Sequence, residues 1–342
     1  MMPDDHDRVI PRYNFAMIWL SGKAYFSGFV IDPFARKCCP MQKIFRLLLY
    51  LSLVFFLWYL YRADYLVFRD IRFDPWLLAA SILLLIAGFL VVCLSWGTAL
   101  NISGKPVGFT DAVISQGTYV FAKYIPGKLW VILGRASWFS PDRSGLKFLS
   151  LVSLQEQLVF LWWGLALSLP PTFFILQKQW LGLIIAAGTA LLTVLLFSSR
   201  LYRYFSRIIS RIFKRNWEFR PMKWSFFFKV SLPVLLFWLL WSAGFWFLMI
   251  SVFDDIPALH AFIFPAGMTY GFMVIFLPAG IGVREGILAA FLMAGGLTAE
   301  NAITVSVISR FWFIAGEIFL FLLAWTLKLT GVGQPASVAE AN

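Results

Sequence analysis

The chain has 342 residues, of which 61% are hydrophobic, 19% aromatic and 13% charged, and its formal net charge is +12. A soluble domain is about half apolar and about one quarter charged, so this composition excludes a soluble enzyme and requires lipid as the solvent. Basic residues are therefore expected in cytoplasmic loops beside anionic lipid, and no nucleic-acid partner is predicted.

Residues 1–40 have a mixed composition and an acidic start, which argues against a secretory signal. We expect this segment to be a cytoplasmic or interfacial extension. It precedes a transmembrane domain over residues 41–331 and a short C-terminal tail over residues 332–342.

Six long apolar segments follow, each near or above the roughly 20 residues that a helix needs to cross the hydrocarbon core. They cover residues 43–62, 75–100, 148–168, 179–199, 225–250 and 301–327. Pro75 is expected in the first turn of its helix, where proline costs no hydrogen bond.

Two further apolar regions are broken by proline and glycine. The first covers residues 111–139 and contains Pro126-Gly127, and the second covers residues 258–296 and contains Pro278-Ala279-Gly280. Their short arms predict re-entrant hairpins or discontinuous helices, which a membrane protein tolerates only inside protein or beside a water-filled cavity. Two full crossings in each region remain the alternative.

The distribution of charge predicts the orientation. Residues 200–223 carry eight basic side chains against the single acid Glu218, so this linker should be cytoplasmic. Basic residues recur at every fourth position from 203 to 215, which predicts either a helix on an anionic membrane surface or a solvated basic loop. With two re-entrant regions, both termini are cytoplasmic and the loop at 169–178 lies outside.

The two broken regions resemble each other and indicate an internal repeat. Residues 124–127 read Tyr-Ile-Pro-Gly and precede Gly134-Arg135, whereas residues 276–280 read Phe-Leu-Pro-Ala-Gly and precede Gly282-Val283-Arg284-Glu285. The halves cover about 75–168 and 225–327. The predicted topology makes them inverted copies, an arrangement that points to a transport site. The predicted fold is therefore an all-α polytopic membrane protein.

The same residues carry a resemblance to a known family. The run Tyr-Ile-Pro-Gly-Lys-Leu-Trp at 124–130 resembles the transmembrane region of the lysylphosphatidylglycerol synthase/flippase family. Arg135, Glu156, the run at 278–285 and Ser309-Arg310 are similar to that family too, over about Met41 to Lys328. Ala279 stands where the family usually has glycine.

The resemblance implies a membrane domain that moves a lipid between leaflets of a prokaryotic cytoplasmic (inner) membrane. Larger members carry an aminoacyl-transferase domain after this region. Only a short tail follows Lys328 here, so transfer of lysine to lipid is not expected. The expected substrate is an anionic phospholipid or a polyprenyl-phosphate-linked lipid, and no cofactor is expected.

Two other functions remain open. One is a membrane glycosyl- or phosphotransferase, for which Asp254-Asp255 is the acidic pair on the outer side. The other is a scaffold for a glycosyltransferase partner or for a second copy of the chain. With three scattered cysteines and two distant histidines, no metal site is predicted.

Ionisable side chains inside membrane segments cost about 2.5–3.5 kcal/mol each at mid-helix and mark candidate sites. The candidates are Lys123, Lys128, Arg135, Glu156, Arg284, Glu285, Arg310 and Glu317. The glycines and prolines expected to shape the site are Pro126, Gly127, Gly134, Pro278, Gly280 and Gly282.

Arg135 and Arg284 are the first choice for phosphate contact, because a guanidinium binds phosphate through two parallel hydrogen bonds. Snorkelling of Arg135 to an interface is the alternative. Lys123 and Lys128 either attract anionic headgroups or anchor the chain in the membrane.

The acidic candidates and Arg310 each have a structural or a functional interpretation. Glu156 is expected to pair with Arg135 or Arg284, or to couple a proton. Glu285 is expected to tune its neighbour Arg284. Arg310 and Glu317 share one helix face two turns apart, as substrate contacts or as a structural stripe.

Overall fold

The computed structural model describes residues 72–124, 129–140, 143–200, 204, 221–273 and 282–330. All of them lie in one of the two units of the chain, Ser52–Asn342. The described residues form helices and no strands. Five of these helices are long and apolar enough to cross a membrane. They are α3 (Pro75–Ile102), α6 (Arg143–Phe174), α7 (Gln179–Phe197), α9 (Trp224–Ile250) and α12 (Ala299–Leu329).

This architecture confirms an all-α polytopic membrane protein. Five of the six predicted spans coincide with long helices, and the sixth, residues 43–62, lies outside the described residues. The predicted loop at 169–178 is wrong in extent, because α6 continues through Pro170 and Pro171 to Phe174. Proline lacks an N–H donor, but its carbonyl oxygen can still accept a hydrogen bond from a later residue of the helix. The Pro171 carbonyl oxygen accepts from the backbone N–H of Ile175 at 3.0 Å.

The start of α3 shows how local sequence sets a helix boundary. The Asp74 carboxylate accepts hydrogen bonds from the backbone N–H groups of Trp76 and Leu77, at 2.8 and 3.0 Å. Pro75 follows in the first turn, as predicted, where its missing N–H costs nothing. Asp74 therefore acts as the helix N-cap rather than as an unstructured loop residue.

Short helices occupy both broken regions. The first contains α4 (Phe109–Thr118), the 3-10 helix η2 (Val120–Tyr124) and α5 (Leu129–Ser137). The second contains the 3-10 helix η3 (Ala258–Phe262), α10 (Ile263–Met273) and α11 (Val283–Ala294). The intervening turns, residues 125–128 and 274–281, lie outside the described residues. The re-entrant geometry and the places of Pro126, Gly127, Lys128, Pro278 and Gly280 therefore stay predictions.

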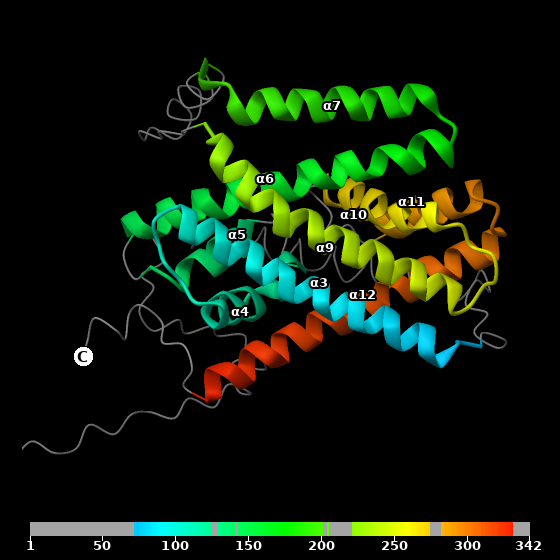
Figure 1. Cartoon of the computed structure of the whole chain (residues 1–342), viewed down its shortest axis with the longest axis horizontal. Helices are drawn as coiled ribbons and strands as arrows, with labels where there is room; N and C mark the ends of the chain where they lie inside the picture. Colours follow the sequence, from blue (N-terminus) through cyan, green and yellow to red (C-terminus); the bar gives the residue numbers. More distant parts are fainter. Residues whose placement is uncertain are drawn as a thin grey trace, which may run out of the picture. The chain divides into compact units, whose positions relative to one another are not determined.

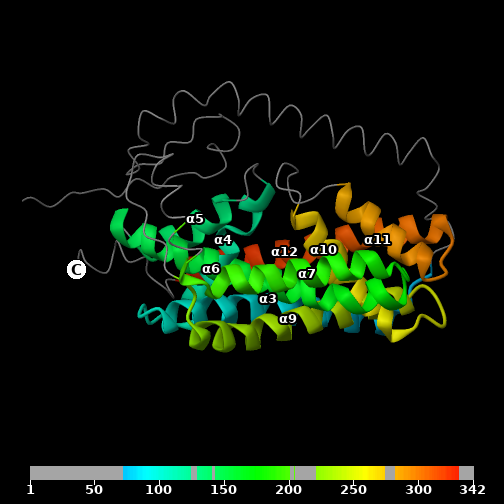
Figure 2. The same cartoon turned by 90° about the horizontal axis from the view of Figure 1, so that it is seen from above.

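Each contact that a helix of one predicted half makes with the other half has a counterpart made by the equivalent helices. The last helix of each half packs against the first short α-helix of the other, α6 against α10 and α12 against α4. In the same way α6 contacts α9 and α12 contacts α3. Figure 2 shows the two sets of short helices on the same side of the α3–α9 pair, toward opposite ends of it. This exchange of contacts supports the predicted repeat.

Helices α3 and α9 make the most extensive helix contact and run in opposite directions, side by side in Figure 1. The backbone N–H of Asp74 donates to the carbonyl of Ser251 at 2.8 Å, so the start of α3 meets the end of α9. Further along, Ser81 Oγ donates to the carbonyl of Gly244 at 2.7 Å. An antiparallel pair is the arrangement that a two-fold relation between inverted halves requires.

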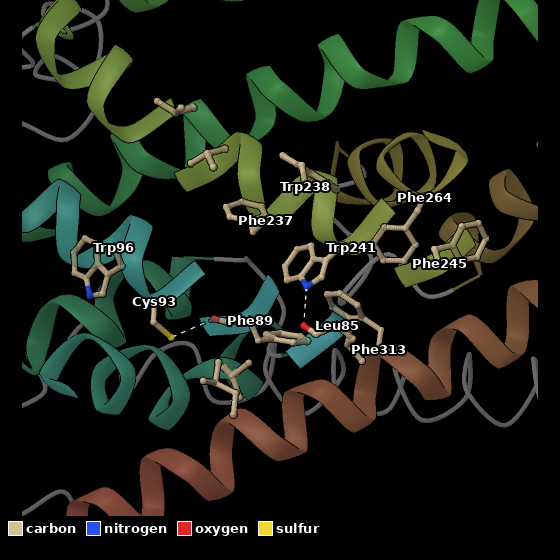
Figure 3. Packing of buried hydrophobic residues seen from close by; sticks show 14 of the residues in the cluster. Leu85, Phe89, Cys93, Trp96, Phe237, Trp238, Trp241, Phe245, Phe264 and Phe313 are labelled. Carbon is tan, nitrogen blue, oxygen red and sulfur yellow. Dashed lines mark hydrogen bonds between the residues drawn. The ribbon is translucent and has the colours of Figure 1, made fainter. Parts of the chain in front are cut away.

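An aromatic core fills the space between α3, α9 and α12 (Figure 3). The Trp241 ring lies 5.1 Å from the Phe89 ring and 5.0 Å from the Phe313 ring, measured between centroids. Trp241 Nε1 donates to the Leu85 carbonyl, which satisfies the indole donor inside the core. This packing holds Phe313 in place, and charged side chains also lie near that ring.

Candidate functional site

Arg135 in α5 and Glu156 in α6 form a buried ion pair. Arg135 Nη2 lies 2.6 Å from Glu156 Oε2, and the two side chains are 0% and 2% exposed. Ser95 Oγ donates to the other carboxylate oxygen at 2.9 Å. A buried charge is stable only when it is paired and hydrogen-bonded, and Glu156 meets both conditions.

Three of the other four N–H donors of Arg135 are also engaged. Nε donates to Ser153 Oγ at 2.6 Å, Nη2 to the Ser153 carbonyl at 2.9 Å, and Nη1 to Gln116 Oε1 at 3.1 Å. The guanidinium carbon lies 4.3 Å from the centre of the Trp96 ring. Of the predicted partners of Glu156, Arg135 is the one present, and the buried Arg135 does not snorkel.

Arg284 has the corresponding place in the second half but different surroundings. It lies in the first turn of α11 and is 2% exposed. Its guanidinium carbon lies 5.3 Å from the centres of both the Phe264 and Phe313 rings. Among the described residues, Nη2 makes one long hydrogen bond, 3.4 Å to the Ser309 carbonyl, and Nε has no hydrogen-bond partner. Arg284 is therefore a buried cation with unused donors.

Glu317 in α12 connects the second half to the first. Its carboxylate, 1% exposed, forms an ion pair with Lys123 of η2 and accepts a hydrogen bond from Tyr124 Oη at 2.9 Å. The Lys123 ammonium also lies 5.0 Å from the centre of the Phe313 ring. Lys123 and Arg284, from different halves, thus approach the same aromatic side chain.

Glu285 and Arg310 form a second ion pair beside Arg284. Arg310 Nη1 lies 3.3 Å from Glu285 Oε1, and the Arg310 guanidinium lies 5.6 Å from the Tyr124 ring centre. The other oxygen of Glu285 accepts from the backbone N–H of Gly282 at 2.8 Å. Gly282 has a φ of +82°, a conformation that glycine adopts without strain. Its N–H is occupied by Glu285 and is therefore not free to bind a ligand.

We call this group the inter-half cluster. It consists of Lys123, Tyr124, Arg284, Glu285, Arg310 and Glu317. Three cations face two carboxylates, so one positive charge is in excess. The carboxylates are nearly inaccessible, whereas the Lys123 and Arg310 side chains are 29% and 14% exposed. An anion approaching the cluster therefore meets cations first.

Sequence reasoning missed several residues that shape this cluster. Tyr124 belongs to the quoted motif, but its bond to Glu317 depends on a contact between η2 and α12. Phe264 and Phe313 are two of 37 phenylalanines, and no sequence signal separates them from ordinary core residues. Gly134 lies against the Tyr119 ring, where a Cβ would collide, so its role is close packing.

The other predicted features lie apart from the cluster or outside the described residues. Asp254 and Asp255, the pair considered for a transferase, are both exposed in the turn after α9. Within the described part of the chain, no three His, Cys, Asp or Glu side chains are placed to share a metal ion. Most of the basic linker 200–223 lies outside the described residues.

Comparison with known proteins agrees with the predicted resemblance. A family model described as the lysylphosphatidylglycerol synthase TM region matches residues 43–316. This match includes every residue of the inter-half cluster except Glu317, which is the next residue after it ends. No curated protein and no solved structure matches the chain. The match covers most of the sequence, and the chain therefore belongs to the family of lysylphosphatidylglycerol synthase transmembrane regions.

Proposed function

We propose that this protein moves an anionic lipid between the two leaflets of a membrane, and that the lipid phosphate binds Arg284. The expected lipid is an anionic phospholipid or a polyprenyl-phosphate-linked lipid. The observation that carries the proposal is the state of Arg284, a buried guanidinium with unused donors in a cluster with one excess positive charge. Membership of the family places the protein among those concerned with lipid modification or flipping.

The chemistry of Arg284 fits a phosphate ligand. Removing a guanidinium from water without a full set of acceptors is costly, and an incoming phosphate supplies those acceptors. A phosphate can accept two parallel hydrogen bonds from one guanidinium, which fixes its orientation. Arg284 also lies in the first turn of α11, where the helix dipole favours negative charge. Lys123 and Arg310, at the accessible edge, would attract the headgroup.

The position of the cluster suggests how binding becomes movement. Lys123 and Tyr124 come from the first half, and the other four members come from the second. In alternating access, one half moves against the other around a site at their junction. A headgroup held between η2, α11 and α12 would thus be exposed to one side and then to the other, while the lipid tails stay in the bilayer.

The two arginines receive different roles under this proposal. A buried guanidinium needs partners for its five donors, and Arg135 makes four hydrogen bonds within the protein. We therefore assign Arg135 and Glu156 to the architecture of the first half, and Arg284 to the lipid. The protein is expected to be non-enzymatic and to reside in the cytoplasmic membrane of a prokaryote with both termini cytoplasmic.

The test is lipid flipping in reconstituted vesicles. Fluorescent phosphatidylglycerol, phosphatidylcholine and polyprenyl phosphate, each labelled on the tail, are incorporated with the protein, and a membrane-impermeant reductant reads the outer leaflet. Arg284→Ala should slow the flipping of the anionic substrate by about tenfold or more, because a bond to a charged group is lost. Lys178→Ala, which removes an exposed cation before α7, is the matched control and should match wild type. Wild-type rates for every lipid in folded Arg284→Ala protein would overturn the proposal.

A further inference from the structure

Glu317 holds a position that the lipid phosphate itself would compete for. We propose that Glu317 is a resident anion, bound to Lys123 and Tyr124 in the lipid-free protein and displaced from them when an anionic headgroup binds. This inference rests on the proposed function and adds the residue that links the charge of the headgroup to movement.

Glu317 is the counter-anion of Lys123, the most accessible cation of the two ion pairs in the cluster. It is almost fully buried, and Lys123 and Tyr124 are the donors that compensate its charge. Lys123 is the most exposed charged member of the two ion pairs in the cluster, so it is accessible to a headgroup while Glu317 is not. The other carboxylate, Glu285, has its own donors in Arg310 and the Gly282 N–H.

A phosphate on Arg284 would place a second anion beside Glu317. The guanidinium of Arg284 and the ammonium of Lys123 lie 5.3 and 5.0 Å from the centre of the same Phe313 ring, and the charge of Arg284 interacts electrostatically with that of Glu317. Two anions at close range repel each other, and the repulsion is strong where water is excluded. The phosphate and Glu317 therefore compete for Lys123, and binding of one weakens the hold of the other.

This competition links headgroup charge to movement. The bonds from Lys123 and Tyr124 to Glu317 join η2 of the first half to α12 of the second. Losing them frees these two segments to separate. A zwitterionic headgroup brings no net negative charge and leaves Glu317 in place. Glu317 thus makes the separation of η2 from α12, and not binding itself, depend on a net negative charge of the headgroup.

Equilibrium binding of short-chain lipids to the full chain in neutral detergent tests the competition. The probes are dioctanoyl phosphatidylglycerol, which is anionic, and dioctanoyl phosphatidylcholine, which is zwitterionic. Glu317→Gln keeps the shape and removes the competing charge, so it should tighten binding of the anionic lipid by about tenfold. Binding of phosphatidylcholine, which leaves Glu317 in place, should change little. Glu300→Gln, the same change at an exposed site on α12, should alter neither value.

A cross-linking measurement reports the separation of η2 from α12 directly. The rings of Phe121 and Phe321 lie 5.5 Å apart on these two segments. The variant Phe121→Cys/Phe321→Cys, with Cys38 and Cys39 replaced by serine, should cross-link efficiently without lipid. Phosphatidylglycerol should lower the yield, and phosphatidylcholine should not. In the Glu317→Gln background the yield should already be low without lipid.

The outcomes separate this inference from the proposed function. If wild-type protein neither binds nor flips any anionic lipid, the proposed function fails and the inference fails with it. If wild type binds phosphatidylglycerol through Arg284, but Glu317→Gln changes neither affinity nor cross-linking, only the inference fails. If Glu317→Gln binds both lipids more weakly by the same factor, the inference also fails, because an equal loss is the result expected of a purely structural carboxylate.

Discussion

Arg135 and Arg284 each donate to the carbonyl oxygen of a serine on the next long helix, Ser153 at 2.9 Å and Ser309 at 3.4 Å. The shared bond marks them as matching positions of the two halves. Their surroundings have diverged, because Arg135 has a carboxylate at 2.6 Å and Arg284 lies beside two neighbouring aromatic rings. The same substitution at the two positions should therefore lower stability strongly at Arg135 but not at Arg284.

Arg135→Met is expected to destabilise the protein strongly. It leaves Glu156 buried without its cation, and breaking a buried pair costs about 3–5 kcal/mol. Thermal unfolding in detergent, followed by tryptophan fluorescence, should show a clear fall in Tm. The double variant Arg135→Met/Glu156→Leu removes both charges and should recover much of the loss. A single variant as stable as wild type would contradict the structural role of the pair.

Arg284→Met is expected to leave the free energy of unfolding unchanged within about 1 kcal/mol, or to raise it, because it removes a buried charge with unused donors. Lipid flipping should nevertheless be lost. The measurement combines Tm with the vesicle assay on the same preparation. Loss of stability as large as that of Arg135→Met would show that Arg284 is a second structural arginine.

Arg284→Lys tests whether the planar guanidinium matters as well as its charge. Lysine keeps the cation but loses the flat fork that lies beside the Phe264 and Phe313 rings and binds phosphate through two bonds. The flipping rate should fall between those of wild type and Arg284→Ala. A rate equal to that of wild type would mean that only the point charge is needed.

Lys123→Glu/Glu317→Lys reverses the ion pair between η2 and α12. Lys123→Glu alone places two carboxylates together and should lower Tm, whereas the double variant restores an ion pair and should regain stability. Binding of phosphatidylglycerol should not recover, because the exposed position then carries a negative charge. Full recovery of binding would contradict a direct role for Lys123 in attracting the headgroup.

Gly117→Val tests the close contact between α4 and α12. A Cβ at Gly117 would lie 2.6 Å from the Leu320 carbonyl oxygen, so any side chain forces the helices apart. Overpacking of this kind costs about 1–3 kcal/mol and should lower Tm. Gly188→Ala in α7, where a Cβ meets nothing within 4 Å, is the control and should not destabilise the protein. Equal Tm values for the two variants would argue against this packing.

Sequence alone determined the class of protein, the positions of the five long spans in the described part of the chain, and the family. Lipid requires about 20 apolar residues per crossing, so hydropathy and length locate spans such as 225–250 within one or two residues of the helix. The same rule singled out the ionisable residues within apolar regions, because such residues are costly unless they are used. The extent of α6 beyond Leu169 was missed, since proline usually ends a helix but does not have to.

Only the tertiary structure decided which charges meet. Glu156 and Glu317 follow the two broken regions in similar places, and sequence spacing does not distinguish their partners. Helix packing brings Glu156 to an arginine 21 residues away, and it brings Glu317 to a lysine 194 residues away in the other half. Ion pairs act over a few ångströms, so the docking of η2 on α12 and of α5 on α6 sets them. Because of this helix packing, Arg135 is a structural residue and Arg284 is a candidate ligand site, although their sequence surroundings are similar.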